Sequence, residues 1–303
     1  MARLWCPFIY LHIKPFTLIK TSTIQLLRIH FAFFLMPVYW FALSQTINIH
    51  IPHALLVFGI LHLLVYPASN GYNSYMDRDT ESVGGIETPQ QPTRQLFYVT
   101  LWLDILALGL SLFISLYFML ALAAYILASR AYSYRGIRLK QYPVIGYLTV
   151  IIFQGGVTFF LVMHGSSVEK ITDVPVAGML TASLLIGGFY PLTQVYQHKA
   201  DKADGVTSIS SMLGYTGTFI FTGIVYFLAM CCLGFYLVSN LEQANFFIIQ
   251  IFFLPVLVYF FWWFKKVGTN NEAANFKNTM RMNMLASFCS NCAFITLLIL
   301  EKN

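Results

Sequence analysis

Long apolar stretches alternate with short polar segments along the whole chain. Each apolar stretch is near the roughly 20 residues that a helix needs to cross a bilayer. Helices and closed barrels are the structures that satisfy every backbone hydrogen bond in lipid, so the pattern predicts an all-α integral membrane protein with a bundle of nine transmembrane helices. The predicted spans are 24–45, 52–73, 96–113, 114–131, 143–164, 175–193, 212–237, 245–264 and 281–300.

The boundary between the third and fourth spans is the least marked. Residues 96–131 form an apolar stretch of 36 residues, with Gly109 and Ser111 near its middle as the residues that suggest a turn. Because 36 residues are too many for one tilted helix, we expect two helices here.

Composition supports the membrane class. The chain has 303 residues, of which 58% are hydrophobic and 10% are charged, whereas soluble domains carry about 25% charged residues. A water-soluble protein is therefore excluded, and we expect one integral domain over 1–303. Residues 1–23 are expected to form an amino-terminal segment at the membrane interface, since Pro7 and Pro15 interrupt the apolar run that a signal peptide would need.

The distribution of basic residues sets the expected orientation. With the amino terminus in the cytoplasm, the outer side keeps only Lys170 and Lys302, as the positive-inside rule requires. The net charge of +6 then reflects topology and attraction to anionic lipid or phosphate, not to nucleic acid. A bacterial plasma membrane is the default location. Sixteen basic residues fall on the inner side: Arg3, Lys14, Lys20, Arg28, Arg78, Arg94, Arg130, Arg135, Arg138, Lys140, Lys199, Lys202, Lys265, Lys266, Lys277 and Arg281.

A first polar cluster follows the second span, at Asn73, Asp77, Asp79 and Glu81. If the segment is helical, Asn73, Asp77 and Glu81 stack at intervals of four along one face, and Asp79 points away. Oxygen ligands arranged in this way suit a hard cation such as Mg²⁺.

A second cluster follows the sixth span. Gln194, Gln197, Asp201 and Asp204 share one face if the segment is helical. Both clusters end even-numbered spans, so both are expected on the cytoplasmic side, facing each other across a central cavity that opens there. Two acidic helix ends would repel each other unless a cation lies between them, and Mg²⁺ prefers to complete its shell with substrate phosphates.

Basic residues accompany the acids. The segment from Arg130 to Lys140 has four positive charges and no acid, which fits half of a diphosphate site or simply the positive-inside bias. Arg28 lies within the first span, where it is expected either to have a partner or to reach the headgroups. Asp104, within the third span, is left out of the site.

The motifs resemble those of the UbiA-type intramembrane prenyltransferases. Asn73-x-x-x-Asp77-x-x-x-Glu81 resembles the family's first aspartate-rich motif, and the segment Tyr132 to Lys140 resembles its tyrosine-and-lysine segment. The Asp201-to-Ser208 run is similar to the end of its second motif. The resemblance covers about residues 24–300, and nine helices are the family's architecture.

Two residues depart from the family pattern. Glu81 replaces the third acid of the first motif, which is conservative for a metal ligand. Gln194 stands where many members carry the first acid of the second motif. Members that resemble the menaquinone-pathway branch carry an amide there, so the departure favours that branch.

The resemblance implies Mg²⁺-dependent transfer of a polyprenyl group from its diphosphate to a small, often aromatic, acceptor, as in quinone or related lipid biosynthesis. It implies Asp77, Asp201, Arg138 and Lys140 as catalytic residues. The implied metal ligands are Asn73, Asp77, Glu81, Gln197, Asp201 and Asp204. The implied diphosphate ligands are Arg28, Tyr132, Arg138, Lys140 and Lys199.

Two other functions remain alternatives: a cation-coupled transporter, and a catalytically weak, lipid-binding relative of the family. A CDP-alcohol phosphotransferase is excluded, because its signature needs further aspartates soon after Asp204 and the next acid is Glu242. Acceptor identity, prenyl chain length and oligomeric state stay open.

Overall fold

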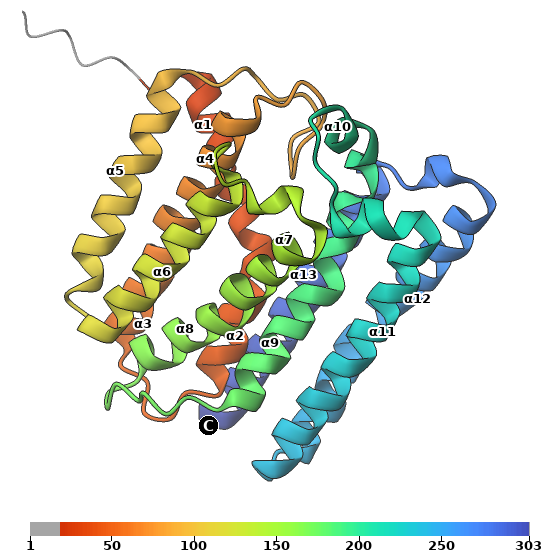
Figure 1. Cartoon of the computed structure of the whole chain (residues 1–303). Helices are drawn as coiled ribbons and strands as arrows, with labels where there is room; N and C mark the ends of the chain where they lie inside the picture. The colour runs from red at the N-terminus through yellow and green to blue at the C-terminus, as the bar shows by residue number, and fades with distance from the viewer. Residues whose placement is uncertain (1–18, 303) are drawn as a thin grey trace, which may run out of the picture.

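The computed structural model describes residues 19–302, and these residues are almost entirely helical (Figure 1). Residues 19–302 contain two isolated β-bridges and no β-strand. Most of the predicted interfacial segment, residues 1–23, lies outside the described residues. Eight helical segments are long and apolar enough to cross a membrane: Thr21–Ser44, Ile51–Asp77, Leu116–Ser133, Pro143–Ser166, Val176–Ala203, Ile209–Ser239, Gln243–Thr269 and Phe276–Leu300.

The apolar stretch 96–131 is divided into two helices, α5 (Arg94–Ser111) and α6 (Leu116–Ser133), as the sequence predicted. The turn between them ends at Ser115, whose hydroxyl accepts a hydrogen bond of 3.0 Å from the backbone N–H of Phe118 and caps α6. The helix α5 carries Arg94 and Asp104 and is not among the eight candidate spans. Nine transmembrane helices therefore remain a prediction.

Several spans change their helical form part-way along. The first consists of α1 (Thr21–Leu27), the 3-10 helix η1 (Ile29–Leu35) and α2 (Met36–Ser44). Arg28 joins α1 to η1 in the left-handed conformation, with φ 48°, which is uncommon for a residue with a side chain.

The second span contains α3 (Ile51–Phe58), the π-helix η2 (Gly59–Val65) and α4 (Tyr66–Asp77). Pro67 is the second residue of α4, just after η2. Its missing N–H and its ring prevent the regular hydrogen bond to the preceding turn, which is a common cause of a distorted helix. The fifth candidate span, numbered from the amino terminus, likewise contains α9 (Val176–Phe189), the 3-10 helix η5 (Tyr190–Gln197) with Pro191, and α10 (His198–Ala203).

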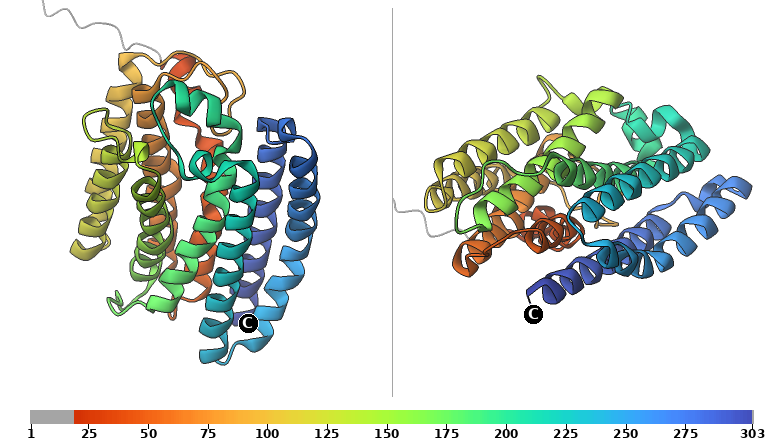
Figure 2. Two further views of the ribbon diagram at one scale, coloured as in Figure 1. Left: turned by 45° about the vertical axis from the view of Figure 1, so that its right-hand side comes forward. Right: turned by 90° about the horizontal axis from the view of Figure 1, so that it is seen from below.

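The remaining helical segments complete the bundle. They are α7 (Pro143–Val150), the π-helix η4 (Ile151–Val157), α8 (Thr158–Ser166), α11 (Ile209–Ser239), α12 (Gln243–Thr269) and α13 (Phe276–Lys302), with short 3-10 turns η3 (Leu139–Gln141) and η6 (Asn271–Ala273). Figure 2 shows these helices side by side in one bundle.

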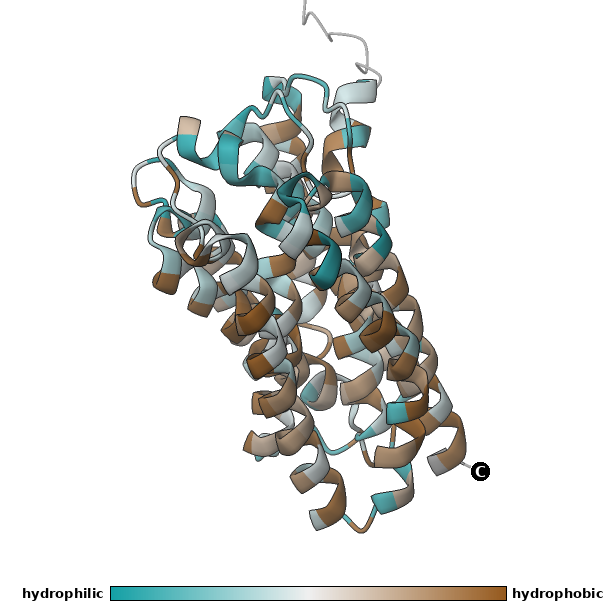
Figure 3. Ribbon diagram, turned by 90° about the vertical axis from the view of Figure 1, so that its right-hand side faces the viewer, coloured by the Kyte–Doolittle hydropathy of each residue, from teal (hydrophilic) through white to brown (hydrophobic). Residues whose placement is uncertain are grey.

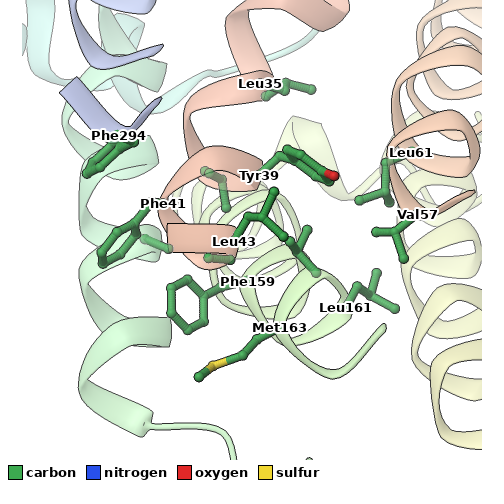
Figure 4. Close-up of a cluster of buried hydrophobic side chains, with 14 of the residues drawn as sticks. Leu35, Tyr39, Phe41, Leu43, Val57, Leu61, Phe159, Leu161, Met163 and Phe294 are labelled. Atoms are coloured by element: carbon green, nitrogen blue, oxygen red, sulfur yellow. The ribbon is translucent and has the colours of Figure 1, made fainter. Parts of the chain in front are cut away.

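A cluster of buried hydrophobic side chains lies between the helices (Figure 4). Phe41 of α2 is fully buried, and its ring centroid lies 4.9 Å from that of Phe294 in α13 and 5.1 Å from that of Phe159 in α8. These contacts tie the first and last spans to the middle of the bundle.

The outward surface is apolar, and the polar residues gather at one end (Figure 3). Large side chains such as Trp102, Phe113 and Phe261 are more than 60% exposed, which is unfavourable in water and ordinary in lipid. The protein is therefore an integral membrane protein with one strongly hydrophilic end.

Candidate active site

Three polar segments meet at the hydrophilic end of the bundle. They are the end of α4 with the loop behind it (73–81), the loop after α6 (134–140), and the end of η5 with α10 (194–204). Figure 1 shows α4 and α10 toward this end, and Figure 3 shows that the end is hydrophilic. The two acidic clusters thus lie on one side, as expected, and the basic loop lies with them.

Asp77 is the most deeply placed acid of the site. Its side chain is 5% exposed and pairs with Nζ of Lys140, while Nη2 of Arg138 lies 3.8 Å from its Oδ1. Both bases are also largely buried. A carboxylate taken out of water needs such partners, because an unpaired buried charge is costly.

The basic loop also holds the second cluster. Arg138 pairs with the Asp204 carboxylate, and its Nη1 donates a hydrogen bond of 3.0 Å to the Asp204 backbone carbonyl. Arg135 lies 3.4 Å from the same carboxylate and donates a 2.7 Å hydrogen bond to the carbonyl of Met76 at the end of α4. One loop therefore connects both acidic segments.

Arg28 enters the site from the break between α1 and η1. It is 5% exposed, and its Nη2 donates a 3.0 Å hydrogen bond to the backbone carbonyl of Asn70. Its Nη1 donates at 3.4 Å to the carbonyl of Gly84. Its Nε has no hydrogen-bond partner, so the guanidinium keeps unused capacity inside the bundle. Arg28 is thus turned inward, and the alternative of reaching the headgroups does not describe it.

Two polar cavities adjoin this guanidinium, and both are lined by Arg28 and Asn73. The larger, of about 170 Å³, is hereafter the polar cavity, and the smaller has about 120 Å³. The polar cavity is lined by Arg28, Ser69, Asn70, Asn73, Tyr125, Ala128, Ser129, Tyr132, Ser133, Thr149, Val150, Phe153, Gln154 and Tyr190.

A third cavity, hereafter the apolar cavity, also has about 170 Å³. It lies between the first and last spans and runs from Phe31 to Phe41 and Phe294. Tyr190 and Gln154 line both this cavity and the polar one. Tyr190 and Gln154 therefore separate the polar cavity from the apolar cavity.

The first cluster differs from its expected geometry. The helix α4 ends at Asp77, and Arg78 turns the chain in the left-handed conformation. The stacking along one helical face therefore holds for Asn73 and Asp77, but Glu81 lies in the following loop and is exposed. Asn73 donates a 3.1 Å hydrogen bond through Nδ2 to the hydroxyl of Ser133.

Asp79, expected to point away, instead lies among the charges of the site. Burial and the neighbouring Asp77 raise the pKa of Asp79 from 3.8 to about 6, against the opposing effect of Lys140 and Arg28. The helix α4 ends before Asp79, and Arg78 turns the chain in the left-handed conformation. The direction of the Asp79 side chain therefore does not follow the helical rotation of about 100° per residue.

The second cluster is not one continuous face either, because η5 is a 3-10 helix up to Gln197 and α10 begins at His198. Gln197 lines the smaller polar cavity. Asp201 interacts electrostatically with Lys140 and accepts a hydrogen bond from Ser208. Asp204 caps the end of α10 and pairs with the arginines of the basic loop.

Three further candidates have different positions. Lys199, expected at the diphosphate, is exposed. Tyr132 lines the polar cavity, and its hydroxyl is hydrogen-bonded to that of Tyr190. Asp104 forms an ion pair with Arg130 between α5 and α6, away from the cluster.

The donors present fit Mg²⁺ that arrives with a diphosphate. Within residues 19–302, no three His, Cys, Asp or Glu side chains are grouped closely enough to hold a metal alone. Mg²⁺, however, typically takes one or two carboxylates together with substrate phosphates. Asp77 Oδ1 is buried without a hydrogen-bond partner, and the amides of Asn73 and Gln197 supply further hard oxygens.

Sequence reasoning missed Tyr190, Gln154 and Asp79. Tyr190 stands directly before Pro191, and Gln154 is a single amide in an apolar span, so both carried a signal: a break in the helix and a polar residue inside the membrane. Asp79 carried no comparable signal, since only the end of α4 decides where it points.

A cluster of acids and bases thus lies beside a polar and an apolar cavity within a helical membrane bundle. A family model described as the UbiA prenyltransferase family matches residues 32–285. The chain belongs to this family, as the motifs indicated, and is a prenyltransferase. No curated protein sequence was found to match the chain.

Solved structures share the fold at low sequence identity. A UbiA homologue from Archaeoglobus fulgidus, bound to GPP and Mg²⁺, has a TM-score of 0.66 and 16% identity over 92% of this chain and 99% of that one. An apo UbiA homologue from Aeropyrum pernix K1 has a TM-score of 0.67 and 17% identity over 88% and 97%. A digeranylgeranylglyceryl phosphate synthase has a TM-score of 0.57 and 18% identity over 92% and 96%.

Proposed function

We propose that this single integral domain transfers a polyprenyl group from a prenyl diphosphate to a small aromatic acceptor, in the presence of Mg²⁺, in quinone or related lipid biosynthesis. The observation that carries the proposal is the shared wall of Tyr190 and Gln154 between a polar cavity at Arg28 and an apolar cavity. The prenyl tail would lie in the apolar cavity and the acceptor in the polar cavity, so the two reacting groups would meet at the wall that the cavities share.

The diphosphate would lie at the ion-paired cluster. Lys140 and Arg138 are held there by Asp77 and Asp204, and Arg28 has an unused nitrogen. Guanidinium and ammonium groups are strong donors to phosphate oxygens. Their buried position makes each contact stronger than it would be in water.

The residues that would hold Mg²⁺ are Asn73, Asp77, Gln197 and Asp201. Asp79 would join them, because it lies among the same charges as Asp77, Lys140 and Arg28. When bound, Mg²⁺ supplies neutralisation of the diphosphate charge as the allylic C–O bond breaks. Lys140 and Arg138, which lie beside the Asp77 carboxylate, would stabilise the same departing charge.

The apolar cavity would hold the start of the prenyl tail. Its wall includes Phe31, Phe34, Phe189 and Phe294. Aromatic faces attract positive charge and exclude water, so they protect an allylic cation from hydrolysis. The acceptor would then approach from the polar cavity.

The orientation that we propose has the site on the cytoplasmic side. The residues around it include Arg135, Arg138 and Lys140 on the basic loop, and the positive-inside rule places such loops in the cytoplasm. Labelling of single cysteines introduced at Lys202 and at Lys170 in intact cells would test this, with Lys202→Cys protected and Lys170→Cys accessible from outside.

The decisive experiment uses the purified protein with Mg²⁺, labelled prenyl diphosphates and a panel of phenolic and naphtholic acceptors. Diphosphate release coupled to a prenylated product supports the transferase, and it should stop with EDTA and in Asp77→Asn and Asp201→Asn. Asp173→Asn is the matched control, since Asp173 is an exposed acid in the loop between α8 and α9. Full turnover in Asp77→Asn would reject the site, and cation-coupled solute uptake without prenyl transfer would favour a transporter.

A further inference from the structure

Gln194 occupies the place at which the second acidic motif is expected to begin, yet its contact is with a phenol. The side chain is 9% exposed, and its Nε2 donates a 2.9 Å hydrogen bond to the hydroxyl of Tyr190. Gln194 does not line the polar cavity or the apolar cavity, as far as the described residues show. It reaches the site through Tyr190.

Tyr190 is the residue that both cavities share with Gln154. Its hydroxyl forms a second hydrogen bond, to the hydroxyl of Tyr132. Tyr132 lines the polar cavity beside Ser129 and Ser133. The three side chains therefore form a chain of hydrogen bonds, from Gln194 through Tyr190 to Tyr132, that ends at the polar cavity.

The direction of this chain follows from the donor at its start. An amide N–H can only donate, so the oxygen of Tyr190 is an acceptor toward Gln194. Its own proton is then best placed on the oxygen of Tyr132, because hydrogen bonds in a chain polarise one another in a common direction. The hydroxyl proton of Tyr132 is left to donate elsewhere, and the polar cavity is the space beside it.

We infer that Gln194 is a positioning residue for the acceptor: through Tyr190 it orients the Tyr132 hydroxyl as a hydrogen-bond donor to an oxygen substituent on the acceptor ring. The acceptor would then sit in the polar cavity with this oxygen toward Tyr132. The inference rests on the proposed function. It assigns Gln194 to the acceptor and not to Mg²⁺.

The competing assignment is a metal ligand, because Oε1 of Gln194 is buried without a hydrogen-bond partner. The two assignments predict different quantities. A positioning residue changes the KM for the acceptor, whereas a metal ligand changes the Mg²⁺ concentration that gives half-maximal activity.

The test compares Gln194→Leu, Tyr190→Phe and the double variant with the wild type. We expect each single variant to raise the acceptor KM about 5- to 20-fold, as for loss of one buried hydrogen bond. The acceptor KM of the double variant should lie within about twofold of that of either single variant, because each substitution interrupts the same chain of hydrogen bonds. The Mg²⁺ requirement should stay within about twofold of the wild type in all three.

A second readout does not depend on turnover. Thermal stabilisation of the purified protein by Mg²⁺ with inorganic diphosphate should be the same in Gln194→Leu and the wild type. Gln194→Asp should leave the Mg²⁺ requirement unchanged as well. Gln250→Leu is the matched control, since Gln250 is another membrane-embedded amide, bonded to Met230 in a separate cavity, and should leave the acceptor KM unchanged.

The opposite pattern would overturn the inference: a raised Mg²⁺ requirement and lost stabilisation by Mg²⁺-diphosphate in Gln194→Leu, with an unchanged acceptor KM. If the wild type itself releases no diphosphate with any acceptor, the proposed function fails first. The two failures are thereby distinguishable.

Discussion

Two buried sets of opposite charges lie in neighbouring parts of this bundle, and they differ in how completely their members are satisfied. Asp104 and Arg130 pair between α5 and α6. Arg130 also donates a 3.2 Å hydrogen bond to the Thr100 carbonyl and lies over the ring of Tyr72, 4.0 Å from its centroid. This pair is closed, and no cavity described above is lined by it.

The cluster around Asp77, in contrast, contains buried polar atoms without hydrogen-bond partners. It joins two acids to three bases across three segments, and it leaves Asp77 Oδ1 and Arg138 Nε buried without hydrogen-bond partners. A closed ion pair in a membrane protein holds helices together. A set of buried charges with unused atoms, such as Asp77, Arg138 and Lys140, has the capacity to bind a charged ligand.

Among the substitutions that distinguish the Asp77 cluster from the Asp104–Arg130 pair, we expect Asp77→Asn to have the largest effect on activity. We expect prenyl transfer to fall by about 100-fold or more, because one ligand of the charge-neutralising group is removed. Steady-state product formation measures it, with a melting curve in detergent to show that the variant is folded. Activity within a factor of three of the wild type would place the reaction elsewhere.

Lys140→Gln should have the next largest effect on the reaction. Loss of one charged hydrogen bond to the diphosphate is expected to raise the KM for prenyl diphosphate about 10- to 100-fold. The acceptor KM should change little. An effect on the acceptor alone would mean that Lys140 does not face the diphosphate.

Asp104→Asn should show the contrasting behaviour of the closed pair. Removal of one partner leaves Arg130 buried without its counter-ion, which costs about 3–5 kcal/mol of stability in such pairs. We expect a clearly lower melting temperature and near-normal turnover per folded molecule. A variant with normal stability and lost turnover would erase the distinction between the two sets.

Asp79 gives the Asp77 cluster a pH dependence. The pKa of Asp79 is about 6 in the folded protein, against an ordinary 3.8. At a pH between these two values, Asp79 is largely protonated in the folded state and largely ionised in the unfolded state. The carboxyl therefore destabilises the fold increasingly as the pH rises from about 4 to 6, and constantly above that. Asp79→Asn should match the wild-type melting temperature near pH 4 and exceed it from pH 6 upward. Equal melting temperatures at pH 7 would contradict the assignment.

Glu81→Gln is expected to have the smallest effect. Glu81 is exposed beyond the end of α4, so activity should change by less than about threefold. Asp79→Asn, measured beside it, should reduce activity more. The reverse order would restore Glu81 as the third ligand of the first motif.

The polar segments were readable from the sequence because a carboxylate at the edge of an apolar span is rare. Asp77 and Asp201 stood out in this way, and the structure brings both segments to one end. The predicted stacking of Glu81 on Asn73 and Asp77 was wrong because the spacing argument assumed a helix through residue 81, whereas the chain turns at Arg78. Local spacing predicts a shared face only as far as the helix continues.

The cavities show the other limit. Tyr190, Gln154 and Phe294 are more than 30 residues apart from one another along the chain, yet they line one space. The helical form changes at Arg28 and beside Pro67 and Pro191. The angles at which helices meet depend on side-chain packing between them.

By itself, the sequence determined the membrane class, the division into apolar spans, the family and the residues that carry charge, because hydrophobicity and charge act locally and their cost in lipid is large. Only the tertiary structure decided which acid joins the cluster, that Lys140 and Arg138 bridge the two acidic segments, and that Gln194 contacts Tyr190. Those outcomes depend on where helices end and how they pack, and each is a sum of many weak contacts that no single residue determines.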